Sequence, residues 1–293
     1  PRGMKRNGET GENSLEWTSR YGSVVTSAFE IASTDGMNEK GLVANLLWLP
    51  ETEYPVRDKN KPGLAITAWV QYMLDNFATV EEAVAYIDED TFQVVSDMMP
   101  DGSRLATLHL SISDATGDCA IFEYIGGKLT VYHSKEYKVM TNSPTYNKQL
   151  ALSEYWKSIG GLSFLPGTNR AADRFARASF YINALPETDD ERIAVASVFS
   201  VVRNASVPYG ISTPESPEIS TTQWRTVSES KNLRYFFESS LTPNTFWVNL
   251  KDFDLSEGAP VFKLSIANGE MYHGNTAKNF KTALPFKFMG VKG

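Results

Sequence analysis

The sequence is short of the residues that build metal centres and disulfide frameworks. It has one cysteine, Cys119, and three histidines, His109, His133 and His273, which lie far apart along the chain. One thiol cannot form an internal disulfide, and no zinc cluster has the cysteine and histidine spacing that it needs. A Ser-His-Asp triad has no GxSxG sequence to support it. We therefore expect no metal, and we interpret His109 as a satisfied residue of a strand.

Long apolar runs and blocks of like charge are also missing. The longest apolar stretches, such as LAITAWV, are too short to cross a bilayer. The 35 acidic and 28 basic residues give a formal net charge of −7 without clustering, which leaves no footprint for nucleic acid or an anionic membrane. We expect neither as a partner. No GxGxxG or GxxxxGK sequence follows a predicted strand, so we expect no nucleotide cofactor and no other cofactor.

The chain does contain an alternation of strand and helix patterns, without internal repeats. Alternating apolar residues predict strands over 14–32 and 41–51 around a turn at 34–41, three more within 105–134, and others over 221–241, 245–255, 258–266 and 284–290. Helical spacing predicts helices over 62–78, 79–87, 151–159, 169–185 and 188–205.

Two of these helices begin with the spacing of a capping box, Thr79 with Glu82 and Thr188 with Glu191. Runs of strands followed by runs of helices favour antiparallel sheets covered by helices. The predicted fold class is therefore α+β, not a doubly wound parallel sheet.

Asn142 stands where a predicted strand passes into a predicted helix, in the stretch VMTNSPTYNKQL over 139–150. Asparagine, serine and proline gather at such junctions because their side chains bond the local backbone, so a turn or cap is one interpretation. The other is a side-chain amide that donates to an oxyanion.

Six separated motifs resemble the choloylglycine hydrolase family, especially its Gram-negative penicillin V acylase branch. They are DGMNEKGLVANLLWLPETEYP, WVQYMLDNFATVEEAV, VMTNSP, LPGTNRAADRFARASFY, RNASVPYG and ESSLTPNTFWVNL, and they follow one another in the family's order over nearly the whole chain. The resemblance implies an N-terminal nucleophile (Ntn) hydrolase fold, a four-layer αββα sandwich of two antiparallel sheets. It also implies one domain over 1–293, usually in a homotetramer, and export to the periplasm if the source is Gram-negative.

The resemblance implies roles for three residues of this chain. Asn142 matches the asparagine of the family's TNSP motif, which helps to hold the oxyanion. Arg174 matches the active-site arginine, although a helix-surface ion pair is the alternative. Trp48 occupies a position that varies within the family. Its backbone N–H would be the second oxyanion donor and its indole would line the acyl pocket, while a core tryptophan is the alternative.

The family's nucleophile is a cysteine at the first position of the mature chain, with its own α-amine, of pKa ~8, as the base. This sequence begins at Pro1, so we expect it to be N-terminally incomplete and to lack the first strands. Cys119 has no free α-amine and cannot take the role. The chain is either part of a complete acylase or a natural truncation that has lost its chemistry.

Two functions follow as hypotheses. The first is an amidohydrolase that cleaves the linear amide of small N-acyl compounds, namely penicillin V, acyl-homoserine lactones or conjugated bile salts. The second is a catalytically inactive homologue that binds acyl ligands without turnover. A third possibility, a purely structural oligomer subunit, would show neither ligand binding nor turnover, and the motif matches argue against it.

Overall fold

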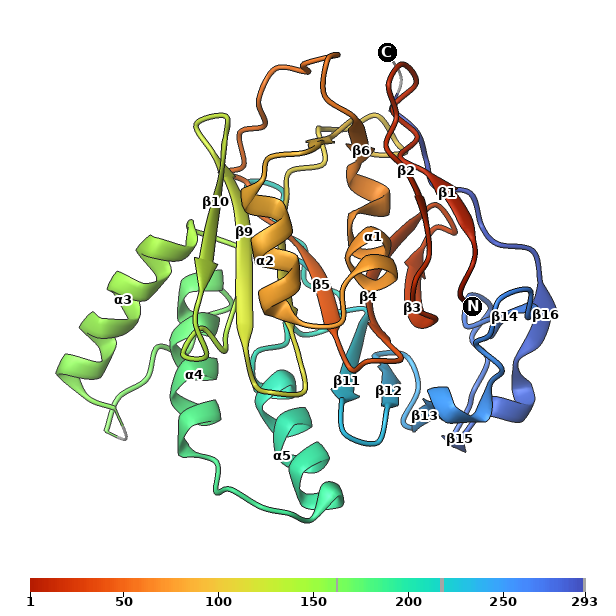
Figure 1. Cartoon of the computed structure of the whole chain (residues 1–293). Coiled ribbons are helices and arrows are strands. Elements are labelled where there is room, and N and C mark those ends of the chain that lie inside the picture. The colour runs from red at the N-terminus through yellow and green to blue at the C-terminus, as the bar shows by residue number, and fades with distance from the viewer. Residues whose placement is uncertain (162, 217–218, 292–293) are drawn as a thin grey trace.

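A six-stranded antiparallel sheet lies at the centre of the computed structural model, which describes residues 1–161, 163–216 and 219–291 (Figure 1). Its strands lie in the order β10-β9-β8-β5-β4-β3. Their bounds are β3 Ser23–Ala28, β4 Ala32–Asn38, β5 Val43–Trp48, β8 Leu108–Ser113, β9 Cys119–Ile125 and β10 Lys128–His133.

A second, four-stranded sheet has the order β11-β12-β13-β15. Its strands are β11 Trp224–Glu229, β12 Arg234–Ser239, β13 Thr245–Asn249 and β15 Gly274–Asn275, and only β15 pairs in parallel. Three two-stranded pairs complete the strands of the described residues. They are β1 Lys5–Asn7 with β2 Glu16–Thr18, β6 Gly63–Ala65 with β7 Gln93–Val95, and β14 Val261–Lys263 with β16 Lys281–Ala283.

Helices pack on both faces of the six-stranded sheet and on the four-stranded sheet (Figure 1). The helices α1 Trp69–Asn76 and α2 Val80–Asp88 pack on one face of the six-stranded sheet, in the core that contains Trp69, Leu110 and Phe122. The helices α3 Tyr146–Ile159 and α4 Ala171–Ala184 pack against its other face. The helix α5 Glu191–Asn204 covers the four-stranded sheet. This arrangement confirms the predicted α+β sandwich.

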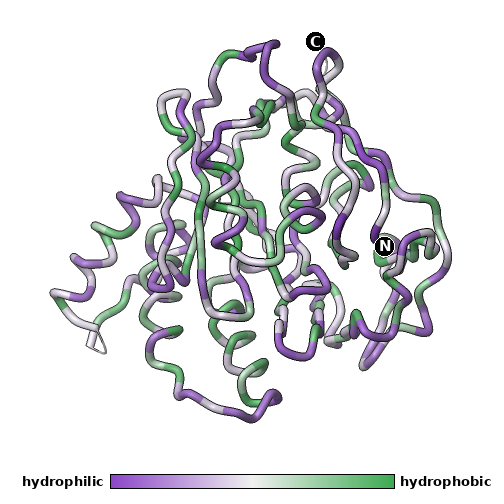
Figure 2. The backbone as a smooth tube through the Cα atoms, viewed as in Figure 1, coloured by the Kyte–Doolittle hydropathy of each residue, from purple (hydrophilic) through white to green (hydrophobic). Residues whose placement is uncertain are grey.

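Hydrophilic residues form the loop between α4 and α5, while the central strands are more apolar (Figure 2). In the described part of the chain, no helix combines the length and the apolar character that a membrane crossing requires. Short 3-10 helices occupy Ile66–Ala68, Leu250–Asp252 and Ala277–Asn279.

The predicted helix boundaries are partly right. Thr79 accepts the Glu82 N–H at 3.2 Å and caps α2 as predicted. The predicted box at the start of α5 is wrong, because Asp190 is the N-cap and accepts the Arg192 N–H at 2.9 Å. The predicted helix over 62–78 begins only at Trp69, because the backbone of Gly63–Ala65 pairs with β7 instead.

Two strand predictions also need correction. Most of the turn predicted at 34–41 belongs to β4, and the chain reverses only over 39–41, where Gly41 has a φ of +83° that favours glycine. The strand predicted over 284–290 is absent. Its Phe286 and Phe288 pack on the main core while the Met289 N–H donates to the Ile31 carbonyl at 2.9 Å. Apolar alternation here reflects packing of an irregular segment.

A buried carboxylate joins the two sheets. Asp35 of β4 accepts hydrogen bonds from the hydroxyl of Tyr235 in β12 and from the indole N–H of Trp224 in β11, the latter at 3.3 Å. The Tyr235 hydroxyl also lies 2.7 Å from Thr26 Oγ1 in β3. Burial raises the pKa of Asp35 above its ordinary value, although these hydrogen bonds oppose the rise. The polar contact therefore fixes how one sheet sits on the other.

We predict that Tyr235→Phe lowers the free energy of unfolding by about 1–3 kcal/mol, because the buried Asp35 carboxyl loses a donor. The folded pKa of Asp35 lies above the unfolded one, so its stabilisation is complete below the unfolded pKa and is lost as pH rises through the folded pKa. Removing the tyrosine raises the folded pKa further. The deficit measured by urea unfolding should therefore be larger at pH 8 than at pH 4. Tyr209→Phe, at an exposed loop position, is the control, and equal unfolding curves for both variants would refute the prediction.

Candidate active site

Asn142 lies in the loop before α3, and its side-chain amide is held from both sides. The Arg174 Nη2 donates to the Asn142 Oδ1 at 2.8 Å, and the Asn142 Nδ2 donates to the Trp48 carbonyl at 2.9 Å. An amide nitrogen carries two hydrogens. The bond to Trp48 uses one of them, and the other is a donor for a further acceptor.

Arg174 lies on the first turns of α4 and is 9% exposed. Its Nε donates to the Asn169 carbonyl at 3.0 Å, so the guanidinium is anchored to the loop that precedes its own helix. Guanidinium is charged at all physiological pH values and has no acceptor. It therefore presents donors, and only donors, to the oxygen of Asn142.

Trp48 is the last residue of β5, opposite Leu108 of β8. The Leu49 N–H donates to the Thr107 carbonyl at 2.9 Å, and the Leu108 N–H donates to the hydroxyl of Tyr54 at 3.1 Å. Bonded and non-bonded pairs alternate in an antiparallel ladder, so the N–H and C=O of Trp48 both point away from β8. Its carbonyl bonds Asn142, and its N–H therefore lies on that same side.

The neighbouring strand β4 does not reach this position. The pairs that join β4 to β5 run from Met37 with Val43 to Asp35 with Asn45. The end of β5 thus has a strand on one side only. The structure brings the three predicted residues into one hydrogen-bonded chain, with two amide donors on one side, which is the arrangement that an oxyanion site needs. Their catalytic roles stay predictions.

The residues that flank Asn142 are fixed by further hydrogen bonds. Thr141 Oγ1 donates to the Ala171 carbonyl at 2.9 Å, and the fully buried Gln149 donates to the Thr141 carbonyl at 2.9 Å. Ser143 Oγ donates to Glu51 Oε1 at 2.6 Å. The loop is thereby tied to α4, to α3 and to the segment after β5. These contacts place the amide on a rigid support.

A buried acid holds the first turn of α3. Glu123 of β9 accepts the Tyr146 N–H at 2.9 Å and lies 2.9 Å from the Nδ1 of His109 in β8. Both side chains are fully buried. The expectation that His109 is satisfied is right for Nδ1 only, because its Nε2 has no partner among the described residues. A carboxylate at a helix N-terminus is favoured by the helix dipole.

Cys119, the single thiol, is unsuited to be a nucleophile. It opens β9, and burial raises the pKa of its thiol to about 11, with Asp118 and Asp114 adding to the effect. The thiolate is the reactive form, so the group is almost wholly neutral at pH 7. Cys119 is also remote from the buried acid at the start of α3, because Glu123 lies four residues further along the strand, roughly 13 Å away. The environment of Cys119 therefore agrees with the expectation that it does not take the role of the nucleophile.

Arg104 reaches the site from the loop between β7 and β8, which carries no recognisable motif. Its guanidinium carbon lies 4.0 Å from the centroid of the Trp48 ring. The contact joins two segments that are distant in sequence, and no local pattern predicts it. Only a structure reveals that a cation covers the indole.

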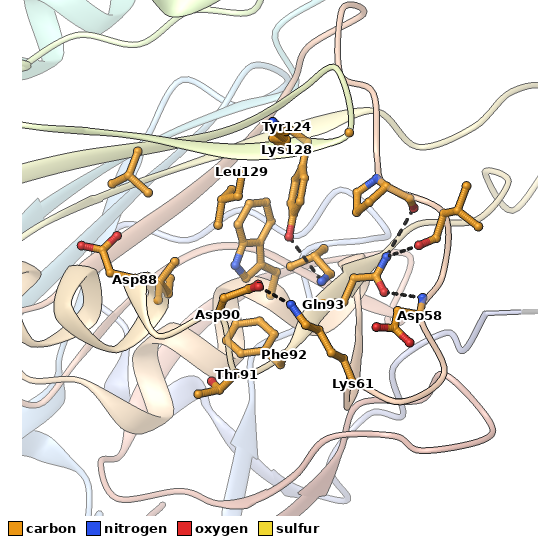
Figure 3. A pocket seen from close by; sticks show the side chains of 17 residues that line it. Asp58, Lys61, Asp88, Asp90, Thr91, Phe92, Gln93, Tyr124, Lys128 and Leu129 are labelled. Atoms are coloured by element: carbon orange, nitrogen blue, oxygen red, sulfur yellow. Dashed lines mark hydrogen bonds and ion pairs between the residues drawn. The ribbon is translucent and has the colours of Figure 1, made fainter.

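A cavity of about 400 Å³ lies elsewhere, among the loop after Pro55, the end of α2, β7 and the β9–β10 hairpin (Figure 3). Its polar groups already bond one another. Gln93 accepts the Asp58 N–H at 2.8 Å, the Tyr124 hydroxyl accepts the Val94 N–H at 3.4 Å, and Lys61 pairs with Asp90. The cavity shares its core with α1 and α2, so it lies across the six-stranded sheet from Asn142.

A group of three or more metal-ligating side chains does not occur in the described ranges. Asn142, Arg174 and Trp48 also supply no metal-ligating carboxylate, thiolate or imidazole. The chemistry that this set offers is hydrogen-bond donation to a developing negative charge.

Comparisons with known proteins show the family of the chain. The family described as "Linear amide C-N hydrolases, choloylglycine hydrolase family" matches residues 1–263. Penicillin V acylase of Pectobacterium atrosepticum is 50% identical over 99% of this chain and 83% of that protein. Bile salt hydrolase/transferase of Clostridium perfringens is 29% identical over 68% of this chain and 67% of that protein.

Solved structures of penicillin V acylase and of conjugated bile acid hydrolase superpose on this chain. Penicillin V acylase from Agrobacterium tumefaciens superposes with a TM-score of 0.93 and 55% identity, over 99% of this chain and 90% of that one. A variant of conjugated bile acid hydrolase from Clostridium perfringens superposes with a TM-score of 0.72 over 92% of this chain and 90% of that one. At 23% identity, the second likeness concerns the fold alone.

We predict that Glu123→Gln lowers the free energy of unfolding by about 1–3 kcal/mol, because a buried charged acceptor is replaced by a neutral one. Hydrogen exchange of the Tyr146 amide should accelerate, since its acceptor is weakened. Glu136→Gln, an exposed position in the preceding loop, is the matched control. Unchanged exchange at Tyr146 in the Glu123 variant would show that the acid does not hold this turn.

Proposed function

This chain belongs to the choloylglycine hydrolase family of linear amide C–N hydrolases, and on that premise we propose that it cleaves the amide of N-acyl compounds, with penicillin V as the first substrate. The observation that carries the proposal is the Asn142 amide, held between Arg174 and the Trp48 carbonyl with one N–H to spare. The similarity to two penicillin V acylases supports the choice of substrate.

In the proposed reaction, a thiolate attacks the carbonyl carbon of the scissile amide and the carbonyl oxygen becomes an oxyanion. Asn142 and the Trp48 backbone N–H donate to that oxygen. Preorganised donors of this kind each lower the activation free energy by about 3–4 kcal/mol. Arg174 is a positioning residue in this scheme, because it acts through the oxygen of Asn142.

Collapse of the tetrahedral intermediate breaks the C–N bond and leaves the acyl group on sulfur as a thioester. The proton taken from the thiol passes to the departing amine. Water then attacks the thioester and releases the carboxylic acid, and a proton from this water restores the thiol. No oxidant, metal or cofactor enters this balance.

We propose that the nucleophile is an N-terminal cysteine of the complete protein that precedes Pro1, with its own α-amine as the base. The support is the nature of Cys119, whose partly buried thiol has a pKa of about 11. An α-amine titrates near pH 8 and can accept a thiol proton at neutral pH.

Penicillin V stands first among the proposed substrates because Trp48 offers an aromatic wall to an aromatic acyl group. Acyl-homoserine lactones and conjugated bile salts are the other members of the proposed range. A homotetramer, and a periplasmic location in a Gram-negative source, belong to the same proposal.

The alternative function is an inactive homologue that binds acyl ligands. That homologue would keep the acyl pocket that the resemblance implies beside Trp48, and it predicts affinity without turnover. The two proposals differ in one measurable quantity, the release of a primary amine from penicillin V by the complete protein.

We predict that Asn142→Ala lowers kcat for penicillin V by about 10²–10³ and leaves KM within a few-fold, because an oxyanion donor acts mainly in the transition state. Asn147→Ala, at an exposed position on the first turn of α3, should keep full activity. Adding Arg174→Gln to Asn142→Ala should cost little more, since both residues act through one amide. Additive losses in kcat would contradict the positioning role of Arg174.

Intact mass and N-terminal sequencing of the native protein test the nucleophile. We expect a chain that begins with cysteine upstream of Pro1, and replacement of that cysteine by serine should abolish amine release. If Pro1 is the true terminus and the protein still binds penicillin V, the inactive homologue is the correct description.

A further inference from the structure

We propose that Arg104 is a specificity-determining residue that selects substrates whose amine half carries a carboxylate. The inference rests on the proposed function and deepens it, because it separates anionic leaving groups, as in penicillins and N-acyl amino acids, from neutral ones such as homoserine lactone. It assigns this choice to a residue outside the Asn142, Arg174 and Trp48 chain.

The first support is the position of the guanidinium. It lies 4.0 Å from the centroid of the Trp48 ring, a distance at which a cation and an indole attract each other. Trp48 also accepts the Asn142 amide on its backbone carbonyl. One residue therefore joins the proposed oxyanion donors to the cation, and a substrate bound at the first is close to the second.

The second support is that Arg104 keeps its hydrogen-bonding capacity. Within the part of the chain that the structure describes, its guanidinium takes part in no hydrogen bond and in no ion pair. The acid in the same loop, Asp101, has its Oδ1 occupied by the N–H and hydroxyl of Ser103, at 3.0 and 2.6 Å. Arg104 is exposed to solvent, so its donors are available to a ligand.

The third support is the way the loop is held. Ser96 Oγ donates to the Ala106 carbonyl at 2.5 Å, and the Ala106 N–H donates to the Asp97 carbonyl at 2.9 Å. Inside this clamp, the Met99 N–H donates to the Arg104 carbonyl at 2.7 Å. The backbone of Arg104 is thus part of a closed hairpin, which limits how far its side chain can move from Trp48.

Stacking and anion binding are compatible on one guanidinium. The planar group lays its face on the indole, and the N–H bonds at its edge stay free for two parallel hydrogen bonds to a carboxylate. In an N-acyl amino acid, the carboxylate lies on the carbon attached to the scissile nitrogen. Such a substrate places its negative charge near the carbonyl that Asn142 would hold.

Glu51, an acid in contact with the loop that carries Asn142, does not cancel this preference. Glu51 accepts the Ser143 hydroxyl at 2.6 Å, and its other carboxylate oxygen is buried without a partner among the described residues. A buried carboxylate oxygen repels an incoming carboxylate from that side. In this proposal the anion binds beside Arg104, above Trp48.

The test compares two substrates that differ only in charge, N-phenoxyacetylglycine and N-phenoxyacetylglycinamide. For the complete protein, Arg104→Gln should raise KM for the acid about tenfold or more and leave KM for the amide within twofold, with kcat unchanged for both. Arg104→Lys keeps the charge but loses the paired donors, so its KM for the acid should lie between those of the wild-type protein and Arg104→Gln. Arg192→Gln, which removes an equally positive but highly exposed side chain on α5, is the charge-matched control.

The methylene isosteres of both compounds, in which CH₂ replaces the scissile N–H, report binding without turnover by titration calorimetry. A tenfold loss of affinity for the acid isostere alone in Arg104→Gln supports the inference, even if the wild-type protein hydrolyses neither substrate. Equal effects on acid and amide, or an effect only on compounds with the carboxylate in the acyl half, would overturn it while amine release still upheld the proposed function. Wild-type protein that neither binds nor cleaves either compound contradicts the inference, whereas amine release from penicillin V decides the proposed function.

Discussion

The orientation of one carboxamide is the constraint on which the site depends. Arginine only donates and a backbone carbonyl only accepts, so the amide between Arg174 and Trp48 has a single favourable orientation, with its oxygen toward α4 and its nitrogen toward β5. Reversing Asn142 would face donor with donor and acceptor with acceptor. The chain achieves this with three segments that meet at one side chain, and the sandwich serves to hold those segments in place.

Buried polar groups between the layers supply that support. Asp35 with Tyr235 joins sheet to sheet, and Glu123, which contacts His109 within the six-stranded sheet, joins that sheet to α3 through the Tyr146 N–H. Apolar packing is tolerant of small displacements, whereas a buried hydrogen bond loses most of its energy when its partners separate or rotate. The layers are therefore held in a specific relative position, and Asn142 inherits this precision through the first turn of α3.

Sequence patterns predicted much of the fold because apolar periodicity reports which face is buried, as in the meander from β8 to β10. They failed where long-range contacts overrode them, at the start of α1 and in the irregular segment around Phe286. Asn142, Arg174 and Trp48 could be predicted from motifs, but their mutual contacts could not. Arg104 and Glu123 carried no motif, because a contact between a guanidinium and an indole, and a buried hydrogen bond between a carboxylate and a helix N–H, arise only when distant segments meet.

The clamp at Ser96, Asp97 and Ala106 has an evolutionary consequence. It closes a hairpin whose tip carries Arg104, while the proposed oxyanion donors belong to the sheet and to the segments packed against it. Insertions and exchanges at the tip of such a hairpin leave the register of the neighbouring strands intact. Descendants of this fold can therefore change the compounds that they accept by replacing one short loop, while the segments that hold Asn142, Arg174 and Trp48 stay the same.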